Sequence, residues 1–247
     1  GGRVGKSSHG AELLISDDPQ KVYQIAVDLD KSNTERQSIE MLLFKLVDSE
    51  IKKYHNYPVL VISGKNWHEG VIGIVASRIK DKYNKPTILI SLNGNKGKGS
   101  GRSIPGFDIG SQIIKAVQSN ILEKGGGHKM AGGFSVCEEK IPIFRDLLIK
   151  NFENSFKSSS EKSNLYLDSI IAPSALNEDF YNEINLLAPF GEGNKEPRFA
   201  IENLKVLSSD IISNAHIKTL LLGMDGSSFK AFAWNAMNST LENYLYK

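Results

Sequence analysis

This chain of 247 residues has a single cysteine, Cys137, so no disulfide can form within it. That excludes a disulfide-stabilised secreted domain and favours an intracellular, cytoplasmic setting. No apolar run approaches the ~18–20 residues that a membrane-spanning helix needs, and no signal peptide is visible. The sequence therefore predicts a protein without a membrane partner.

Signatures of catalysis and metal binding are also missing. The five histidines lie far apart, and neither an HxxxH nor a CxxC pattern occurs. No pair of carboxylates stands out in a plausible catalytic loop. The chain begins at Gly1 without a methionine, which indicates a fragment of a longer protein. We therefore expect binding chemistry, with no metal ligands and no catalytic centre supplied by this chain alone.

The net charge is only +2, which excludes a polycation that binds nucleic acid through bulk charge. The basic residues are instead clustered. Between Gly64 and Ile104, eight Lys or Arg face only Glu69 and Asp81, so this segment carries +6. Its end, Gly94–Ser103, combines glycines with basic and hydroxyl side chains, which are the donors that suit a phosphodiester backbone.

Within that segment we favour a ligand role for Arg102 and Ser103, which border the apolar residue Ile104. For Lys96 and Lys98 we favour a solvated hairpin tip. Another candidate pair, Trp67 and His68, precedes Gly70 at the predicted start of a helix. There the two rings could stack on a base and approach a phosphate, or Trp67 could simply cover the core, and both interpretations stay open.

The most unusual stretch is Gly125–Phe134, whose first nine residues hold five glycines with His128 and Lys129 between them. Each glycine inside a helix or strand costs roughly 0.5–1 kcal/mol relative to alanine, so we expect neither element here. Such a run predicts backbone at positive φ or backbone brought close to a ligand, and its N–H groups suit an anion. The alternative is a glycine-rich turn with a solvated His128.

The pattern of apolar residues predicts an α/β fold. Residues 17–54 are expected to form one long helix with a polar middle that bridges two domains, or two helices broken near Ser32–Asn33. A domain over 56–157 alternates strands with helices. The strands are expected at 59–63, 86–92, 98–104 and 133–137, and the helices at 70–83, 108–122 and 142–156.

Residues 157–164 are a low-complexity polar linker, which we take as the domain boundary. Beyond it, over 165–247, the sequence predicts a small β-barrel that is incomplete. Its strands are expected at 165–171, 199–207, 217–222 and 229–234, with one helix at 179–187. Phe229, Phe232 and Trp234 could stack on bases, although a place in the barrel core is the favoured interpretation for at least two of them.

Three motifs together resemble the RecJ family of single-strand-specific exonucleases, part of the DHH phosphodiesterase superfamily. They are Trp67–Arg78 (WHEGVIGIVASR), Gly99–Ser103 (GSGRS) and Gly125–Gly133 (GGGH followed by AGG). Segment by segment, the resemblance implies the end of a catalytic DHH domain and the long connecting helix over 1–55, a DHH-associated domain over 56–157, and an OB-type barrel over 165–247.

The resemblance also implies a function. The family removes nucleotides from the 5′ end of single-stranded DNA in repair and recombination, using Mn²⁺ or Mg²⁺ held by Asp and His residues. Those metal-binding motifs do not occur in this sequence and would precede Gly1. This chain would therefore be a substrate-binding part that is inactive alone and monomeric, with single-stranded DNA as its partner.

By the same resemblance, His128 is expected to act in catalysis by donating to a phosphate oxygen. The substrate-binding residues would be Arg102, Ser103, Gly126, Gly127, Trp67, His68 and Arg3. Two other classes stay open. One is a DHH-type phosphodiesterase that acts on oligonucleotides or cyclic dinucleotides, and the other is a nucleic-acid-binding module without nuclease activity.

Overall fold

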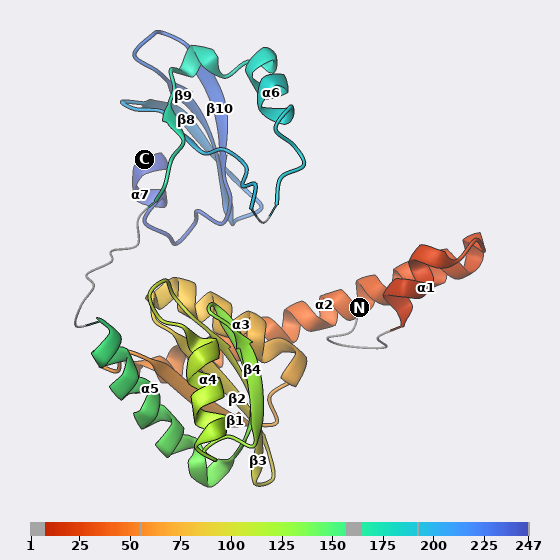
Figure 1. Cartoon of the computed structure of the whole chain (residues 1–247). Helices are drawn as coiled ribbons and strands as arrows, with labels where there is room; N and C mark the ends of the chain where they lie inside the picture. Colours follow the sequence, from red (N-terminus) through yellow and green to blue (C-terminus); the bar gives the residue numbers. More distant parts are fainter. Residues whose placement is uncertain (1–7, 55, 157–164, 192, 247) are drawn as a thin grey trace. The chain divides into compact units, whose positions relative to one another are not determined.

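The computed structural model describes residues 8–54, 56–156, 165–191 and 193–246 (Figure 1). The chain divides into two compact units, Gly1–Lys162 and Ser163–Lys247. The predicted linker 157–164 lies outside the described residues. Each unit has its own sheet, and the α/β class with a following OB-like region is confirmed.

The first unit begins with α1 (His9–Ile15) and the long α2 (Pro19–Glu50), which a short 3₁₀ turn follows (η1, Ile51–Lys53). Asp18 caps α2, since its Oδ1 accepts hydrogen bonds from the backbone N–H groups of Gln20 (2.9 Å) and Lys21 (3.3 Å). The 32 residues of α2 run without a break. The prediction of one helix is therefore confirmed over that of two.

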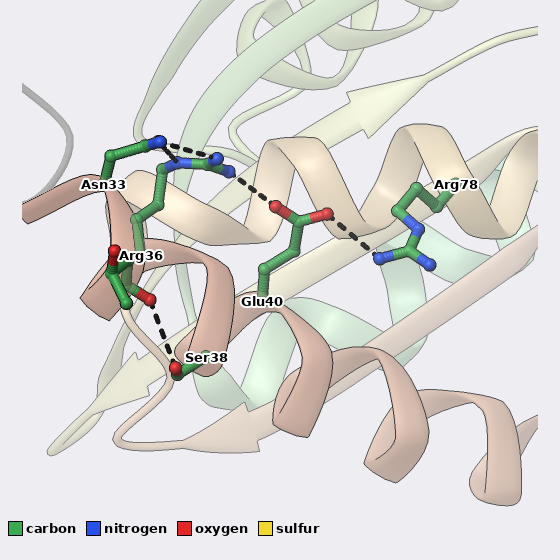
Figure 2. A network of polar contacts seen from close by, with 6 residues as sticks. Asn33, Arg36, Ser38, Glu40 and Arg78 are labelled. Atoms are coloured by element: carbon green, nitrogen blue, oxygen red, sulfur yellow. Dashed lines mark hydrogen bonds and ion pairs between the residues drawn. The ribbon is translucent and has the colours of Figure 1, made fainter. Parts of the chain in front are cut away.

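The polar middle of α2 is attached to α3 (Glu69–Tyr83) through Glu40 (Figure 2). One oxygen of this carboxylate contacts Arg36 Nη1 at 2.6 Å, and the other contacts Nη1 of Arg78, on α3, at 3.0 Å. Asn33 Oδ1 accepts two further hydrogen bonds from Arg36. Arg78 also lies over the Phe44 ring, 4.4 Å from its centroid. The polar residues of α2 thus hold it against the α/β domain.

The sheet has five strands in the order β1-β2-β3-β5-β4. Only β1 and β2 are parallel, and α3 forms the crossover between them, whereas the other neighbours are antiparallel. The strands are β1 (Leu60–Lys65), β2 (Thr87–Asn93), β3 (Lys96–Arg102), β4 (Lys124–His128) and β5 (Ala131–Cys137). After them come η2 (Glu138–Lys140) and α5 (Ile141–Phe156), and α4 (Ile109–Gln118) precedes β4.

Both faces of β1 and β2 are covered, which explains their nearly continuous apolar sequence. Leu60, Ile62 and Leu89 pack with α2 and α3 on one face. Val61 and Ile88 pack on the other face, in a cluster that also contains residues of α4 and α5. The first unit is therefore a three-layer α/β domain.

The glycine run is not a loop, so the expectation of no regular structure there is wrong. It forms β4 and β5, which pair as a hairpin with His128 opposite Ala131, and none of its glycines has φ in the left-handed region. Two of them make room for Ile113 of α4, because a Cβ on Gly125 or Gly132 would lie 2.7 or 2.4 Å from its side chain. Close helix packing overrides the low strand propensity of glycine.

The second unit contains a three-stranded antiparallel sheet, β10-β9-β8, and a two-stranded parallel pair, β6 and β7. In β9, Ile217, Thr219 and Leu221 are buried and alternate with less buried residues. The elements are β6 (Ser169–Ile170), η3 (Pro173–Ala175), α6 (Glu178–Asn185), β7 (Phe199–Ala200), β8 (Lys205–Ile212), β9 (His216–Leu222), β10 (Ser228–Ala233) and α7 (Glu242–Leu245).

Two predicted strands of this unit need correction. Over 165–171, only Ser169–Ile170 forms a strand, and the stretch 199–207 is divided between β7 and β8. A left-handed residue, Asn203 (φ 55°), lies between these two strands and turns the chain there. The described strands of the second unit form an open three-stranded sheet and a separate two-stranded pair, which agrees with the predicted incomplete barrel.

Candidate functional site

The pairing register brings several predicted residues together at one end of the first sheet. Arg102 of β3 lies opposite Ala131 of β5, which in turn lies opposite His128 of β4. Two strand spacings separate Arg102 from His128, or roughly 10 Å between their backbones. Gly126 and Gly127 occupy the neighbouring positions of β4. The structure therefore places Arg102 on β3 and both glycines and His128 on β4, with β5 between the two strands.

One face of this region is bare. A Cβ on Gly126 would meet no atom within 4 Å, and one on Gly133 would meet only a carbonyl oxygen, at 3.7 Å. Gly133 lies opposite both Gly126 and Ser100, so the three share a face of the sheet. We call this surface the glycine face and define it by residues that share it: Ser100, Arg102, Gly126, His128, Ala131 and Gly133.

Arg102 is half-buried and oriented by its neighbours. Its Nη1 donates to Ser100 Oγ at 3.1 Å and to the Gly101 carbonyl at 2.7 Å. Its guanidinium also lies against Gly73 of α3, where a Cβ would come within 2.8 Å of Nη2. A guanidinium held in this way is pre-organised to bind an oxyanion. Sequence analysis missed Ser100, although its spacing of two from Arg102 in a strand puts both on one face.

His128 is exposed, and its Nδ1 accepts a hydrogen bond from the Met130 N–H at 3.4 Å. In the neutral imidazole this leaves the proton on Nε2, which can donate to a ligand. The backbone of His128 is fixed from behind by α4. A Cβ on Gly110 would lie 2.9 Å from the His128 carbonyl, and the Ile109 N–H donates to the Lys129 carbonyl at 3.2 Å.

The start of α4 is itself secured by Asp108, whose Oδ1 accepts a hydrogen bond from the Ser111 N–H at 3.0 Å. The pKa of Asp108 is below its ordinary value, mainly because of this backbone hydrogen bond. The Lys129 charge lowers this pKa further. The helix that supports His128 thus carries an ionised cap at neutral pH.

Ser103 has a different place from the predicted one. It is 1% exposed, and its Oγ donates to the Phe107 carbonyl at 2.5 Å. Its N–H donates to the Met130 carbonyl at 2.9 Å, which joins the end of β3 to the β4–β5 turn. The hydroxyl therefore makes its hydrogen bond within a turn. In this structure the Ser103 side chain is not accessible for the predicted phosphate contact.

The prediction that the N–H groups of both Gly126 and Gly127 bind phosphate also needs correction. β4 is an edge strand that pairs with β5 on one side only. Consecutive residues in an antiparallel strand direct their N–H groups to opposite sides. One of the two glycines therefore donates toward β5, and only the other can donate outward along the edge.

Trp67 and His68 lie far from His128 but nearer to the Arg102 end of the site, since Glu69, next to His68, pairs with Lys98 at 2.7 Å, two residues from Ser100. His68 is the N-cap of α3, where its Nδ1 accepts from the Gly70 N–H at 3.1 Å. The Trp67 ring lies against Gly64 and packs with the apolar cluster under α2. Gly64 is four strands and four residues away from His128 by register, more than ~20 Å. Helix capping and core packing account for both rings.

The remaining predicted residues divide as follows. Lys96 and Lys98 form surface ion pairs with Glu123 (3.3 Å) and Glu69 (2.7 Å), which agrees with the solvated interpretation. Arg3 lies outside the residues that the structure describes.

In the second unit, Phe229 is opposite the buried Leu221 and faces the core. Phe232 and Trp234 are exposed instead.

No group of three His, Cys, Asp or Glu residues that could hold a metal occurs in the described part of the chain. These described residues therefore do not fit a resident metal ion. None of the helices in that part of the chain is long and apolar enough to cross a membrane.

Comparison with domain families gives two matches. The DHHA1 domain matches residues 56–154, and the RecJ OB domain matches residues 167–245. Among curated proteins, the single-stranded-DNA-specific exonuclease RecJ of Thermus thermophilus is 32% identical over 205 residues, which cover 81% of this chain and 28% of that protein. The protein of the same name from Haemophilus influenzae is 30% identical over 232 residues, which cover 89% of this chain and 40% of that protein.

Solved structures give a consistent result. The crystal structure of RecJ from Thermus thermophilus in complex with Mn²⁺ has a TM-score of 0.73 at 25% identity and covers 94% of this chain and 33% of that one. Its complex with Mg²⁺ has a TM-score of 0.68 at 25% identity, with coverage of 92% and 34%. The chain spans between about a quarter and two fifths of the length of the curated relatives it matches.

Proposed function

Because this chain belongs to the RecJ family, we propose that it is the DNA-holding part of a single-stranded-DNA-specific exonuclease that digests in the 5′-to-3′ direction in DNA repair and recombination. The observation that carries the proposal is the glycine face, where bare strand backbone lies beside Arg102 and His128. A flat surface without side chains lets a phosphodiester approach closely, while the two cationic or donating groups beside it supply its partners.

In this proposal the strand lies over Gly126 and Gly133. The guanidinium of Arg102, oriented by Ser100, pairs with a phosphate oxygen, and the outward N–H of the glycine edge donates to the same backbone. Ser103 has a structural role: its buried hydroxyl donates to the Phe107 carbonyl and fixes the turn between β3 and α4, and its backbone N–H joins β3 to the hairpin. These contacts are independent of base identity, as exonuclease digestion along a strand requires.

His128 has the catalytic role. Its Nε2–H donates to a phosphate oxygen next to the scissile bond, where negative charge increases in the transition state. A divalent metal held by the parent protein would supply an activated water and further charge stabilisation. The described residues do not fit a metal site, so we propose that its ligands come from elsewhere in the parent protein, which would use Mn²⁺ or Mg²⁺, the ions crystallised with the Thermus protein.

The match to the RecJ OB domain favours this function over a phosphodiesterase for cyclic dinucleotides and over a module without nuclease context. We further propose that the chain acts as a monomer in the cytoplasm. Sedimentation equilibrium checks the first point, since a mass of 27.2 kDa is expected over a range of concentrations.

The proposal is tested with the purified 247-residue chain and fluorescent oligo(dT). We expect weak binding whose log K falls with log salt, by about 0.7 for each phosphate contact, and no digestion in Mn²⁺. Binding that does not respond to salt would contradict the role of the glycine face. Digestion by this chain alone would contradict the assignment of the metal site to another part of the protein.

A further inference from the structure

The side of the sheet that carries the glycine face continues toward the other end of the same three strands. Ser135 of β5 lies opposite both Lys98 of β3 and Lys124 of β4. Each of them is two positions along its strand from a member of the glycine face, so all three side chains lie on that side of the sheet. The burial pattern agrees, because Phe134 and Val136 are buried on the opposite side. The glycine face is thus bordered by a hydroxyl between two lysines.

These three side chains differ in the partners they already have. The Nζ atom of Lys98 contacts a carboxylate oxygen of Glu69, on α3, at 2.7 Å. Glu123, which precedes Lys124 in the chain, is likewise paired with another lysine, at 3.3 Å. Among the described residues, Lys124 makes no ion pair and the Ser135 hydroxyl makes no hydrogen bond. An ammonium group and a hydroxyl are therefore available next to each other at this end of the sheet.

A strand held at Arg102 has few directions in which to continue. Toward α3 the way is closed, because the guanidinium lies against Gly73. Two directions remain, across the strands to the free edge of β4 and lengthwise along β4 and β5. Lengthwise the surface is bare, since a Cβ on Gly126 would meet no atom within 4 Å. The next side chains in that direction are those of Ser135 and Lys124.

The spacing along the strands suits a phosphodiester chain. Residues on one face recur every two positions, or ~6.8 Å at ~3.4 Å per residue. A stacked nucleic-acid strand has one phosphate per ~3.4 Å, and an unstacked strand extends to roughly twice that. Its phosphates can therefore follow successive rows of the sheet. Ala131, opposite Arg102, and Ser135 are separated by two such steps on β5, about 14 Å.

We propose that Ser135 and Lys124 form a second phosphate site, so that the single strand runs lengthwise along β4 and β5 from Arg102 instead of crossing them. A hydroxyl beside an ammonium group is a pair of donors that positions a nucleic-acid backbone. The proposal rests on the proposed function and adds to it a second contact and a direction for the strand. It also gives Gly126 and Gly133 a shared role, which is to keep the path between the two contacts free of side chains.

The experiment measures binding of fluorescent oligo(dT) to the whole 247-residue chain by anisotropy at several salt concentrations. Lys124→Ala should lower the slope of log K against log salt by about 0.7, as expected for one lost phosphate contact on a single strand. Lys124→Arg should restore the slope. Ser135→Ala removes a neutral donor, so it should weaken binding by about threefold to tenfold and leave the slope unchanged. Circular dichroism checks that each variant is folded.

Lys115→Ala is the matched control for Lys124→Ala. It removes the same charge from an exposed position of α4, the helix that packs against Gly125 and Gly132 on the opposite side of the sheet. This variant should bind oligo(dT) with an unchanged slope. An equal loss of slope in both variants would show that net charge alone is responsible, and would refute the second phosphate site.

Gly133→Val tests the direction of the strand. A Cβ at this position would meet only a carbonyl oxygen at 3.7 Å, so the fold should survive. The new side chain would lie between the row of Arg102 and the row of Lys124. A strand that runs lengthwise should lose both contacts, which lowers the slope by about 1.4. An unchanged slope would show that the strand crosses the sheet, and would refute the proposal.

The outcomes separate this inference from the proposed function. If Arg102→Ala lowers the slope while Lys124→Ala behaves like the unchanged chain, only the second phosphate site is refuted. If the chain does not bind oligo(dT), or if neither variant alters the salt dependence, the second phosphate site and the proposed role of the glycine face are both refuted.

Discussion

The two units present opposite kinds of surface. On the glycine face, Gly126 of β4 and Gly133 of β5 carry no side chain, so a stretch of backbone is uncovered next to Arg102 and His128. In the second unit, the rings of Phe232 and Trp234 are exposed and lie 4.6 Å apart between their centroids. The first surface suits the part of a strand that is the same at every nucleotide, and the second suits the bases.

The units also differ in the size of their buried apolar cores. The first has apolar clusters on both faces of its sheet. In the second, the described residues include only three buried apolar side chains, Ile217, Leu221 and Ala236. Because burial of apolar area is the main stabilising term, we expect the second unit to unfold first. On heating, the second unit should therefore unfold at a temperature at which the first unit, with its glycine face, is still folded.

The largest expected effect is at His128. In a full-length family member, the change that corresponds to His128→Ala should lower kcat by about 100-fold, as removal of a transition-state donor does, with a much smaller change in KM. The change at Lys96, on a surface ion pair, is the matched control and should leave kcat within about twofold. An unaltered kcat in the His128 variant would reduce this residue to a structural role.

A pair of glycine substitutions tests whether the bare face is functional. Gly126→Val adds a side chain where a Cβ meets no atom within 4 Å, so the fold should survive while binding of single-stranded DNA falls by about tenfold or more. Gly132→Val, on the opposite face, forces a Cβ within 2.4 Å of Ile113. It should lower the melting temperature of the first unit, at a cost of about 1–3 kcal/mol.

These two variants are measured by anisotropy and by thermal unfolding. The reverse result, with Gly126→Val unfolded or Gly132→Val fully stable, would overturn the assignment of faces. If Gly126→Val is stable and binds DNA normally, the glycine face is not the binding surface.

Arg102→Ala and Trp234→Ala should differ in how strongly their binding to single-stranded DNA depends on salt. Loss of one phosphate contact should reduce the slope of log K against log salt by about 0.7, whereas Trp234→Ala should leave that slope unchanged. The affinity of each variant is measured between about 50 and 200 mM salt, concentrations over which multiple phosphate contacts change affinity strongly. Equal slopes for the two variants would contradict the assignment of a phosphate contact to Arg102 and not to Trp234.

The smallest expected effect concerns pH. Burial raises the pKa of Asp48, but hydrogen bonds from Lys82 and Tyr83 outweigh it, so this pKa lies below its ordinary value. Ionised Asp48 therefore stabilises the folded state above the unfolded pKa of about 4, and this contribution is lost as pH falls through the lower folded value. Asp48→Asn should cost about 0.5–1 kcal/mol at about pH 7 and less at about pH 3.

The matched control for Asp48 lies in the second unit. Hydrogen bonds from the backbone of Ser227 and Ser174 lower the pKa of Asp225. Thermal unfolding followed by circular dichroism should show the transition of the first unit shifting in Asp48→Asn, and that of the second unit shifting in Asp225→Asn. Coupled shifts of both transitions would show that the units do not unfold independently.

Much of this arrangement is predictable from sequence. The order of β1, β2, β3 and β5 with α2 to α5 follows from apolar periodicity, whereas β4 does not. The family resemblance predicted from three motifs is confirmed. The predicted neighbourhood of Arg102 and the glycine run agrees with the register. The two-residue spacing in β3 puts Ser100 on the face of Arg102, but the contact that gives Ser100 its role depends on how the guanidinium packs against Gly73 of α3.

Other features depend on packing that local sequence does not encode. Five glycines in nine residues argue against strands. The glycines nevertheless form the paired strands β4 and β5. On one face of this hairpin, Ile113 occupies the space that side chains would fill. Ser103 reads as an exposed loop hydroxyl, but the turn to Phe107 buries it. Phe229, Phe232 and Trp234 are similar in sequence, and only strand alternation separates the core ring from the two exposed ones.

The attachment of α2 through Glu40 has a mechanical consequence. From Glu40 back to Pro19 the helix extends about 32 Å, at about 1.5 Å per residue, without a break. A tilt of about 5° at Glu40 would move the far end by about 3 Å, and a displacement of ~1 Å can already reduce a reaction ~100-fold. Arg36 of α2 and Arg78 of α3 both contact the Glu40 carboxylate. These two contacts therefore limit how far Pro19 and α1 can move relative to α3.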